Sequence, residues 1–225
     1  MVMETIRCAK RTEVAEVDGR LAEMELDRES LIAAGTHALM AAAGADPLHP
    51  ANAAGFFAYA DGVRGIRAEI IGGNWTFFAQ EGVEGIENKK LRLRVLFANV
   101  VSACGRDDPQ ARSRKGAGSE RVACGDMFDA AGIELPVTVV KFHGDFRTYY
   151  LMVDESGSME LSFPVVKNGK FLRCVERIFL IDGDELDKFD IDLDEPDNDP
   201  GPEIVVTKKT LFCFHPIIFV PIILV

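Results

Sequence analysis

Asp154, Ser156 and Ser158 alternate along the chain directly after the apolar run at positions 149–152. A carboxylate and two hydroxyl groups are hard oxygen ligands of the kind that Mg²⁺ prefers. One functional hypothesis is therefore a magnesium-dependent enzyme that uses these three side chains.

The order Asp-x-Ser-x-Ser at the end of a buried strand resembles the beginning of the metal-ion-dependent adhesion site of von Willebrand factor A domains. The resemblance implies a doubly wound sheet in which a helix follows the strand. Residues 160–166 instead alternate between polar and apolar side chains and include Pro164, which is typical of a half-buried strand. We therefore predict that residues 155–158 form the turn of a β-hairpin, with Gly157 at positive φ, and that no metal is bound there.

A second group of residues, at positions 112–121, has the chemistry of an anion site. Glycines let backbone N–H groups approach an anion closely, and arginine binds phosphate through two hydrogen bonds. The residues of this candidate anion or phosphate site are Arg112, Arg114, Lys115, Gly116, Gly118 and Arg121. The lysine precedes the glycines, so this is not a Walker A loop. Three interpretations stay open: a solvated surface loop, a contact to phosphate or nucleic acid, and a contact to acidic protein segments, including the chain's own acidic stretch.

The cysteines and histidines show no recognisable catalytic or metal-binding pattern. The five cysteines are scattered, without a C-x-x-C pair, which is typical of a protein in a reducing cytoplasm. We expect neither a zinc site nor a cofactor. His143-Gly144-Asp145 is interpreted as a turn, and Trp75 as an anchor of the core rather than a residue that stacks on a ligand.

The composition favours a globular protein that does not attract polyanions at long range. The chain has 225 residues, is 48% hydrophobic and carries a formal net charge of -11. A charge of this sign weakens general attraction to nucleic acid or to an anionic membrane. The apolar run at positions 211–225 is shorter than a membrane span and is interrupted by Pro216 and Pro221. We expect a cytoplasmic protein without a membrane span.

Helix signals gather in the first part of the chain. Asp27 is a predicted N-cap of a helix from Arg28 to about Ala43, and residues 14–24 form either a short helix or a pair of strands. A short helix is predicted near positions 53–60, followed by an irregular or extended segment. Its interior glycines would cost a longer helix roughly 2–3 kcal/mol relative to alanine.

Strand signals dominate the second part. Strands are predicted at positions 74–78, 91–97, 137–142, 147–153, 159–166 and 171–181. Asn168-Gly169 is a strong hairpin signal between the last two. The predicted class is α+β, with N-terminal helices packed on a mainly antiparallel sheet that ends in a C-terminal β-meander of four strands.

We expect one globular domain over residues 1–188, with a soft boundary in the loop 104–125. An acidic linker at 189–203 and an apolar tail at 204–225 follow, the tail being either a functional element or non-native read-through. The favoured function is a non-catalytic binding or regulatory protein that acts through a protein partner. One alternative is a nucleic-acid-binding accessory protein that uses loop 112–121, with the acidic segment as competitor. The other is the magnesium-dependent enzyme.

Overall fold

The computed structural model describes residues 8–113, 116 and 146–184. The chain divides into a compact unit over residues 1–191 and a second unit over residues 192–225, and all described residues belong to the first. The strand expected at 137–142, the turn at 143–145, the acidic linker 189–203 and the tail 204–225 lie outside the described residues.

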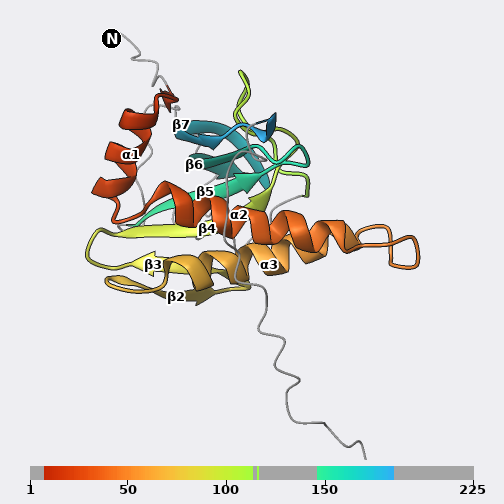
Figure 1. Ribbon diagram of the computed structural model, residues 1–225. Coiled ribbons are helices and arrows are strands. Elements are labelled where there is room, and N and C mark those ends of the chain that lie inside the picture. Colours follow the sequence, from red (N-terminus) through yellow and green to blue (C-terminus); the bar gives the residue numbers. More distant parts are fainter. Residues whose placement is uncertain (1–7, 114–115, 117–145, 185–225) are drawn as a thin grey trace, which may run out of the picture. The chain divides into compact units, whose positions relative to one another are not determined.

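Seven strands of the described part form one mixed sheet, in the order β1-β7-β6-β5-β4-β3-β2 (Figure 1). They are β1 (Ala9–Arg11), β2 (Trp75–Gln80), β3 (Val83–Asn88), β4 (Leu93–Asn99), β5 (Arg147–Val153), β6 (Met159–Lys167) and β7 (Lys170–Ile181). The β4–β5 and β1–β7 pairs are parallel, and the other neighbouring pairs are antiparallel. The sheet is therefore mainly antiparallel, as predicted.

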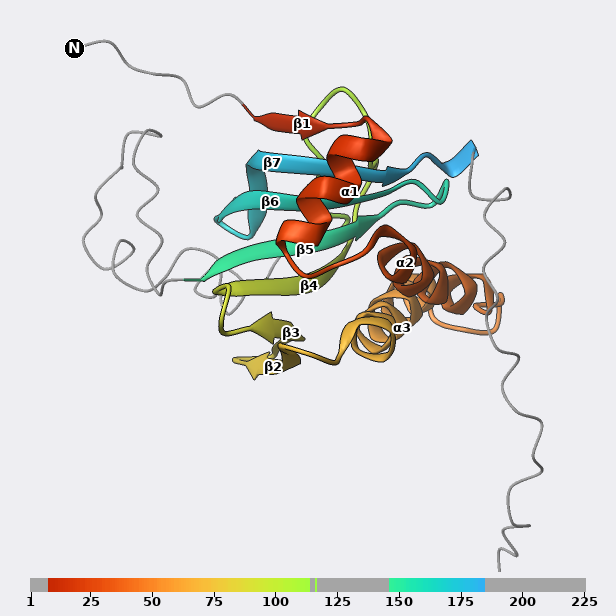
Figure 2. The same cartoon turned by 60° about the vertical axis from the view of Figure 1, so that its left-hand side comes forward.

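Helices α1 (Val14–Glu23), α2 (Arg28–Ala43) and α3 (Ala53–Ile70) precede β2 in the chain. They pack on one face of the sheet (Figure 2). Asp27 caps α2, because its Oδ1 accepts a hydrogen bond from the backbone N–H of Ser30 at 2.7 Å. Helices early in the chain and strands late in it confirm the α+β class. The segment at 14–24, predicted to be either a short helix or a pair of strands, forms the helix α1.

The prediction for α3 was wrong, because the helix continues to Ile70 instead of ending near position 60. Two of its glycines, Gly62 and Gly65, lie at close contacts of α3 with β4 and with α2. An added Cβ at Gly62 would lie 2.5 Å from the Phe97 ring, and one at Gly65 would lie 2.7 Å from a backbone oxygen of α2. The close packing buries Val63 and Ile66, each worth about 1.5–3 kcal/mol. This gain offsets the low helix propensity of glycine.

The C-terminal meander agrees with the prediction for the three strands that are described. Gly157 has φ +90° in the β5–β6 turn, and Asn168 and Gly169 have φ +53° and +72° in the β6–β7 turn. Pro164 is accommodated in β6 by a register shift next to Phe163. Strands β1 and β3 were not predicted.

Each face of the sheet has its own hydrophobic cluster. The cluster on the first face joins the helices to all strands except the short β1. The cluster on the opposite face, called the second face below, contains no helix residue, and the loop at positions 100–111 packs on it. Within the described ranges, no helix is both long enough and apolar enough to cross a membrane.

Candidate functional site

Only part of the predicted anion site belongs to the described residues. Arg112 pairs with Glu155, and its backbone N–H donates to the Asn99 carbonyl at 3.1 Å. A Cβ added to Gly116 would meet no atom within 4 Å, so the described surroundings do not require a glycine there. Arg114, Lys115, Gly118 and Arg121 lie outside the described residues. The anion site therefore stays a prediction.

The Asp154 turn brings its three oxygen-bearing side chains together. Asp154 Oδ1 accepts from the Ser156 hydroxyl at 2.6 Å and from the backbone N–H groups of Ser156 and Ser158, while Oδ2 accepts from Ala103 N–H at 2.8 Å. The two serine Oγ atoms are 3.0 Å apart, and Ser158 Oγ also accepts from Gly183 N–H at 3.0 Å. Both carboxylate oxygens of Asp154 therefore already accept hydrogen bonds from protein groups. The absence of a metal here stays a prediction.

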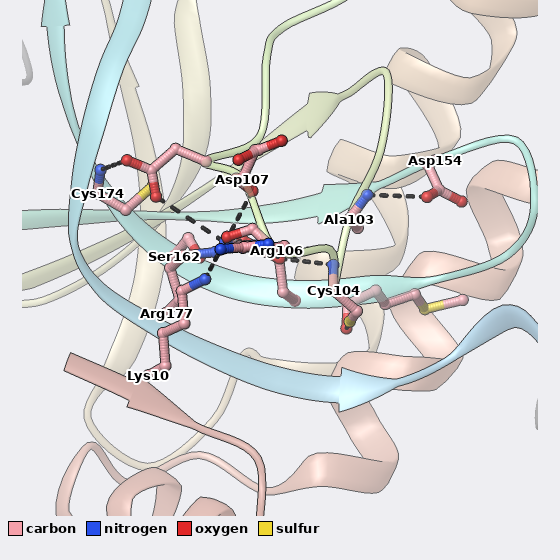
Figure 3. A network of polar contacts seen from close by, with 12 residues as sticks. Lys10, Ala103, Cys104, Arg106, Asp107, Asp154, Ser162, Cys174 and Arg177 are labelled. Carbon is pink, nitrogen blue, oxygen red and sulfur yellow. Dashed lines mark hydrogen bonds and ion pairs between the residues drawn. The ribbon is translucent and has the colours of Figure 1, made fainter. Parts of the chain in front are cut away.

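A buried ionic cluster on the second face is centred on Arg177 of β7 (Figure 3). The side chain of Arg177 is 0% exposed, and it donates to both carboxylate oxygens of Glu160, at 2.6 and 3.0 Å. Its Nη1 donates to the Asp107 carbonyl at 2.8 Å. Glu160 also accepts from the Ser162 hydroxyl at 2.6 Å and from Cys104 N–H at 2.7 Å. This cluster holds residues 104–107 on the sheet, and all three guanidinium nitrogens of Arg177 donate to protein acceptors.

A groove open to solvent lies on the other half of the second face, where β2, β3 and β4 run side by side. Its volume is about 540 Å³. The residues that line it are Phe77, Phe78, Ala79, Gln80, Glu87, Lys89, Arg94 and Phe146. It combines aromatic walls with three charged side chains, so it can contact both apolar and charged parts of a ligand.

Arg94 forms the centre of this groove. Its Cζ atom lies 4.3 Å from the ring centroid of Phe78 and 4.4 Å from that of Phe146, so two aromatic rings hold the guanidinium. Its side chain is 15% exposed, and its buried Nε donates no hydrogen bond. Glu87 lies directly opposite on β3, but its Oε2 is 3.5 Å from Nε, beyond the length of a charge-assisted hydrogen bond. Burial lowers the pKa of Arg94, and Glu87 opposes this shift only in part.

The groove borders β2, which is an edge strand of the described part of the sheet. Among the described strands β2 pairs with β3 alone, and its six residues include no charged one. Phe77 on this strand is 66% exposed, although Arg67 of α3 lies 5.4 Å from its ring centroid. The other edge strand, β1, has three residues, two of which are Lys10 and Arg11. Short length and positive charge protect an edge strand from pairing with other chains, and β2 has neither.

Sequence reasoning correctly placed Trp75 and missed the groove. Trp75 is 3% exposed in the core, and its Nε1 donates to the Glu25 carbonyl at 2.8 Å. The alternation of Leu93, Arg94 and Val95 was a usable signal, because it places Arg94 on the face opposite its two buried neighbours. The same signal could not show that aromatic rings from distant segments would enclose the guanidinium.

No group of three or more His, Cys, Asp or Glu side chains in the described ranges is arranged to hold a metal ion. Comparison of the chain with protein-family models, with curated proteins and with solved structures finds no match.

Proposed function

We propose that this chain is a non-catalytic binding or regulatory protein, and that a segment of a protein partner binds along β2 and the groove beside it. The observation that carries the proposal is the uncharged six-residue edge strand with the exposed Phe77, next to an open groove. An edge of this kind is a template for pairing with an extended segment of another chain.

The chemistry of strand addition fits this part of the molecule. Main-chain hydrogen bonds to a free edge supply affinity for any extended segment, and pockets for alternate side chains supply specificity. Phe77 offers apolar surface at the edge, and the groove receives side chains on the second face. Protein recognition of this type does not require a positive field, so the net charge of -11 does not oppose it.

Peptides selected from a random display library against the full-length chain test this proposal. We expect the selected peptides to slow hydrogen exchange at the amides of β2. The change Phe77→Lys should abolish binding, since a charge on an edge strand opposes strand addition. Leu172→Lys is the matched control, because Leu172 is also an exposed apolar residue on a strand, 53% exposed on β7. Protection elsewhere than on β2, or equal losses from the two changes, would refute the proposal.

The two alternative functions gain no specific support. Nucleic-acid binding by loop 112–121 depends on cations that lie mostly outside the described residues. A magnesium-dependent reaction at Asp154 would first have to displace the hydrogen bonds that fill its carboxylate.

A further inference from the structure

We infer that Arg94 is a receptor for a single carboxylate, supplied by a glutamate side chain of the bound segment. The inference rests on the proposed function for the source of the carboxylate, and on the groove alone for its chemistry. It adds to the proposed function a specific requirement for one acidic side chain.

The contacts of the Arg94 guanidinium favour a carboxylate ligand. The ring centroids of Phe78 and Phe146 lie 4.3 and 4.4 Å from the Arg94 Cζ atom, so two aromatic contacts restrain the guanidinium. The buried Nε of Arg94 has no hydrogen-bond partner, and the carboxylate oxygen paired with it, Glu87 Oε2, lies 3.5 Å away. A planar fork of donors that is held in place matches the two oxygens of a carboxylate.

The net charge of the groove favours a ligand with a single negative charge. Its charged lining residues are Arg94, Lys89 and Glu87, which sum to +1. Lys89 Nζ lies 3.4 Å from Glu87 Oε1 and is largely solvated, so Glu87 is shared between two cations at long distances. One carboxylate would neutralise the groove. A phosphate dianion would leave an excess negative charge beside Glu87, in a chain that is already strongly acidic.

The distance between Arg94 and the β2 edge favours a long acidic side chain on the bound segment. Arg94 belongs to β4, and β3 lies between β4 and the free edge strand β2. Two strand spacings amount to roughly 10 Å. The guanidinium contacts Phe78, a residue of β2, so the groove around Arg94 extends to that edge strand. A glutamate on a segment bound along β2 spans the remaining gap better than the shorter aspartate.

The small molecule N-acetyl-glutamate N-methylamide, a monoanion, tests the carboxylate receptor without any knowledge of the partner. The ¹⁵N–¹H signal of the Arg94 Nε group is the readout in the full-length protein. We expect a saturable shift with the glutamate compound. The binding should be about tenfold weaker with the glutamine analogue or with inorganic phosphate, because each loses a charge-assisted interaction or adds repulsion.

Two variants sharpen the test. Glu87→Gln removes the competing carboxylate and should tighten binding several-fold, whereas Arg94→Lys keeps the charge but loses the planar fork and should weaken it about tenfold. For Arg94→Lys the readout is the amide shifts of groove residues. Arg147→Lys is the matched control. Arg147 is exposed at the start of the neighbouring strand β5, and the alternation of side chains along β5 places it on the helix-covered face, opposite the groove.

The outcomes separate this inference from the proposed function. Equal binding of the glutamate and glutamine compounds, or an unchanged Arg94 Nε signal, overturns the carboxylate receptor. Library peptides that protect β2 without enrichment in glutamate overturn it as well, while the proposed function stands. A carboxylate response at Arg94 without peptide binding at β2 supports the receptor and refutes the proposed function.

Discussion

Arg94 and Arg177 lie on the same face of the sheet and both stack on aromatic rings, yet they differ in every other contact. Arg177 is completely buried and donates to Glu160 at 2.6 and 3.0 Å. Arg94 lies in an open groove, and its nearest carboxylate oxygen is 3.5 Å away. The Arg177 cluster uses its donors to hold a loop, whereas the Arg94 groove leaves donors available to a ligand.

The pKa directions of the two guanidinium groups follow from these contacts. Burial lowers the pKa of Arg177, but the hydrogen bonds and charge of Glu160 outweigh burial and raise it. Burial also lowers the pKa of Arg94, and the distant Glu87 does not reverse the shift. A buried cation with a close carboxylate is a structural element, whereas Arg94, with two aromatic rings and a carboxylate at 3.5 Å, keeps an Nε without a hydrogen-bond partner.

The largest effect should come from breaking the Arg177 cluster. Arg177→Met leaves Glu160 buried without its partner and should lower the free energy of unfolding by about 3–5 kcal/mol in urea denaturation. Replacing Glu160 by Leu in the same chain should restore much of the loss, because no buried charge then remains unpaired. A loss below about 1 kcal/mol for the single change would show that the cluster is not structural.

A third cluster that contains arginine lies on the helix-covered face around Glu176, and it makes the free energy of unfolding depend on pH. Burial raises the pKa of Glu176, but hydrogen bonds from Arg20, Tyr149 and Arg11 bring it down to about 2. The folded-state pKa is below the unfolded value of about 4.3, so this stability is present above about pH 5 and is lost as the pH falls toward 2. The contribution is on the order of 2 kcal/mol.

Urea denaturation between pH 6 and about pH 3 measures this contribution, as the linkage relation requires. Glu176→Gln should flatten the decline of stability over that range. The same decline in the variant would mean that Glu176 is not the group responsible. Glu84→Gln serves as the control, because Glu84 is an exposed carboxylate that pairs with Arg67 on the surface.

Arg94→Met should cost far less stability than Arg177→Met. The change removes two cation–π contacts, but methionine still packs against the two rings and no buried carboxylate loses a close partner. We expect a loss below about 1 kcal/mol, together with complete loss of the carboxylate response. Equal losses of stability from the two arginine changes would contradict the comparison, since Arg94 would then be a structural residue.

The smallest effect is expected at Asp154, a carboxylate whose acceptors are filled as completely as those of Glu160. Millimolar Mg²⁺ should leave the Tm of the full-length chain unchanged, because a metal would have to displace hydrogen bonds from Ser156, Ser158 and Ala103. A rise in Tm that Asp154→Ala abolishes would show a metal site at this turn.

Much of the fold could be predicted from local signals. Asp27 begins α2 because its side chain accepts a backbone N–H, a contact made within three residues. The β6–β7 hairpin follows from Asn168-Gly169, where both residues adopt positive φ, and the turn before Met159 follows from Gly157. These features depend on neighbours in the chain, and such interactions can be read from the sequence.

The candidate site could not be predicted in the same way, because its contacts join distant segments. Sequence reasoning placed the anion-binding chemistry at Arg112 and its neighbours, where it stays a prediction, and overlooked Arg94. Phe78 and Phe146 reach Arg94 only when β2, β3, β4 and the start of β5 are assembled into one sheet.

The sequence by itself determined where chain segments turn and which residues of each strand face the core, because backbone conformation and side-chain alternation are local. Only the tertiary structure decided that α3 continues through Gly62, where the ring of Phe97 occupies the space that a Cβ atom would need. It also decided that Arg177 has a close carboxylate and Arg94 does not. Distances between atoms of different strands depend on the packing of the whole sheet, and no local pattern contains them.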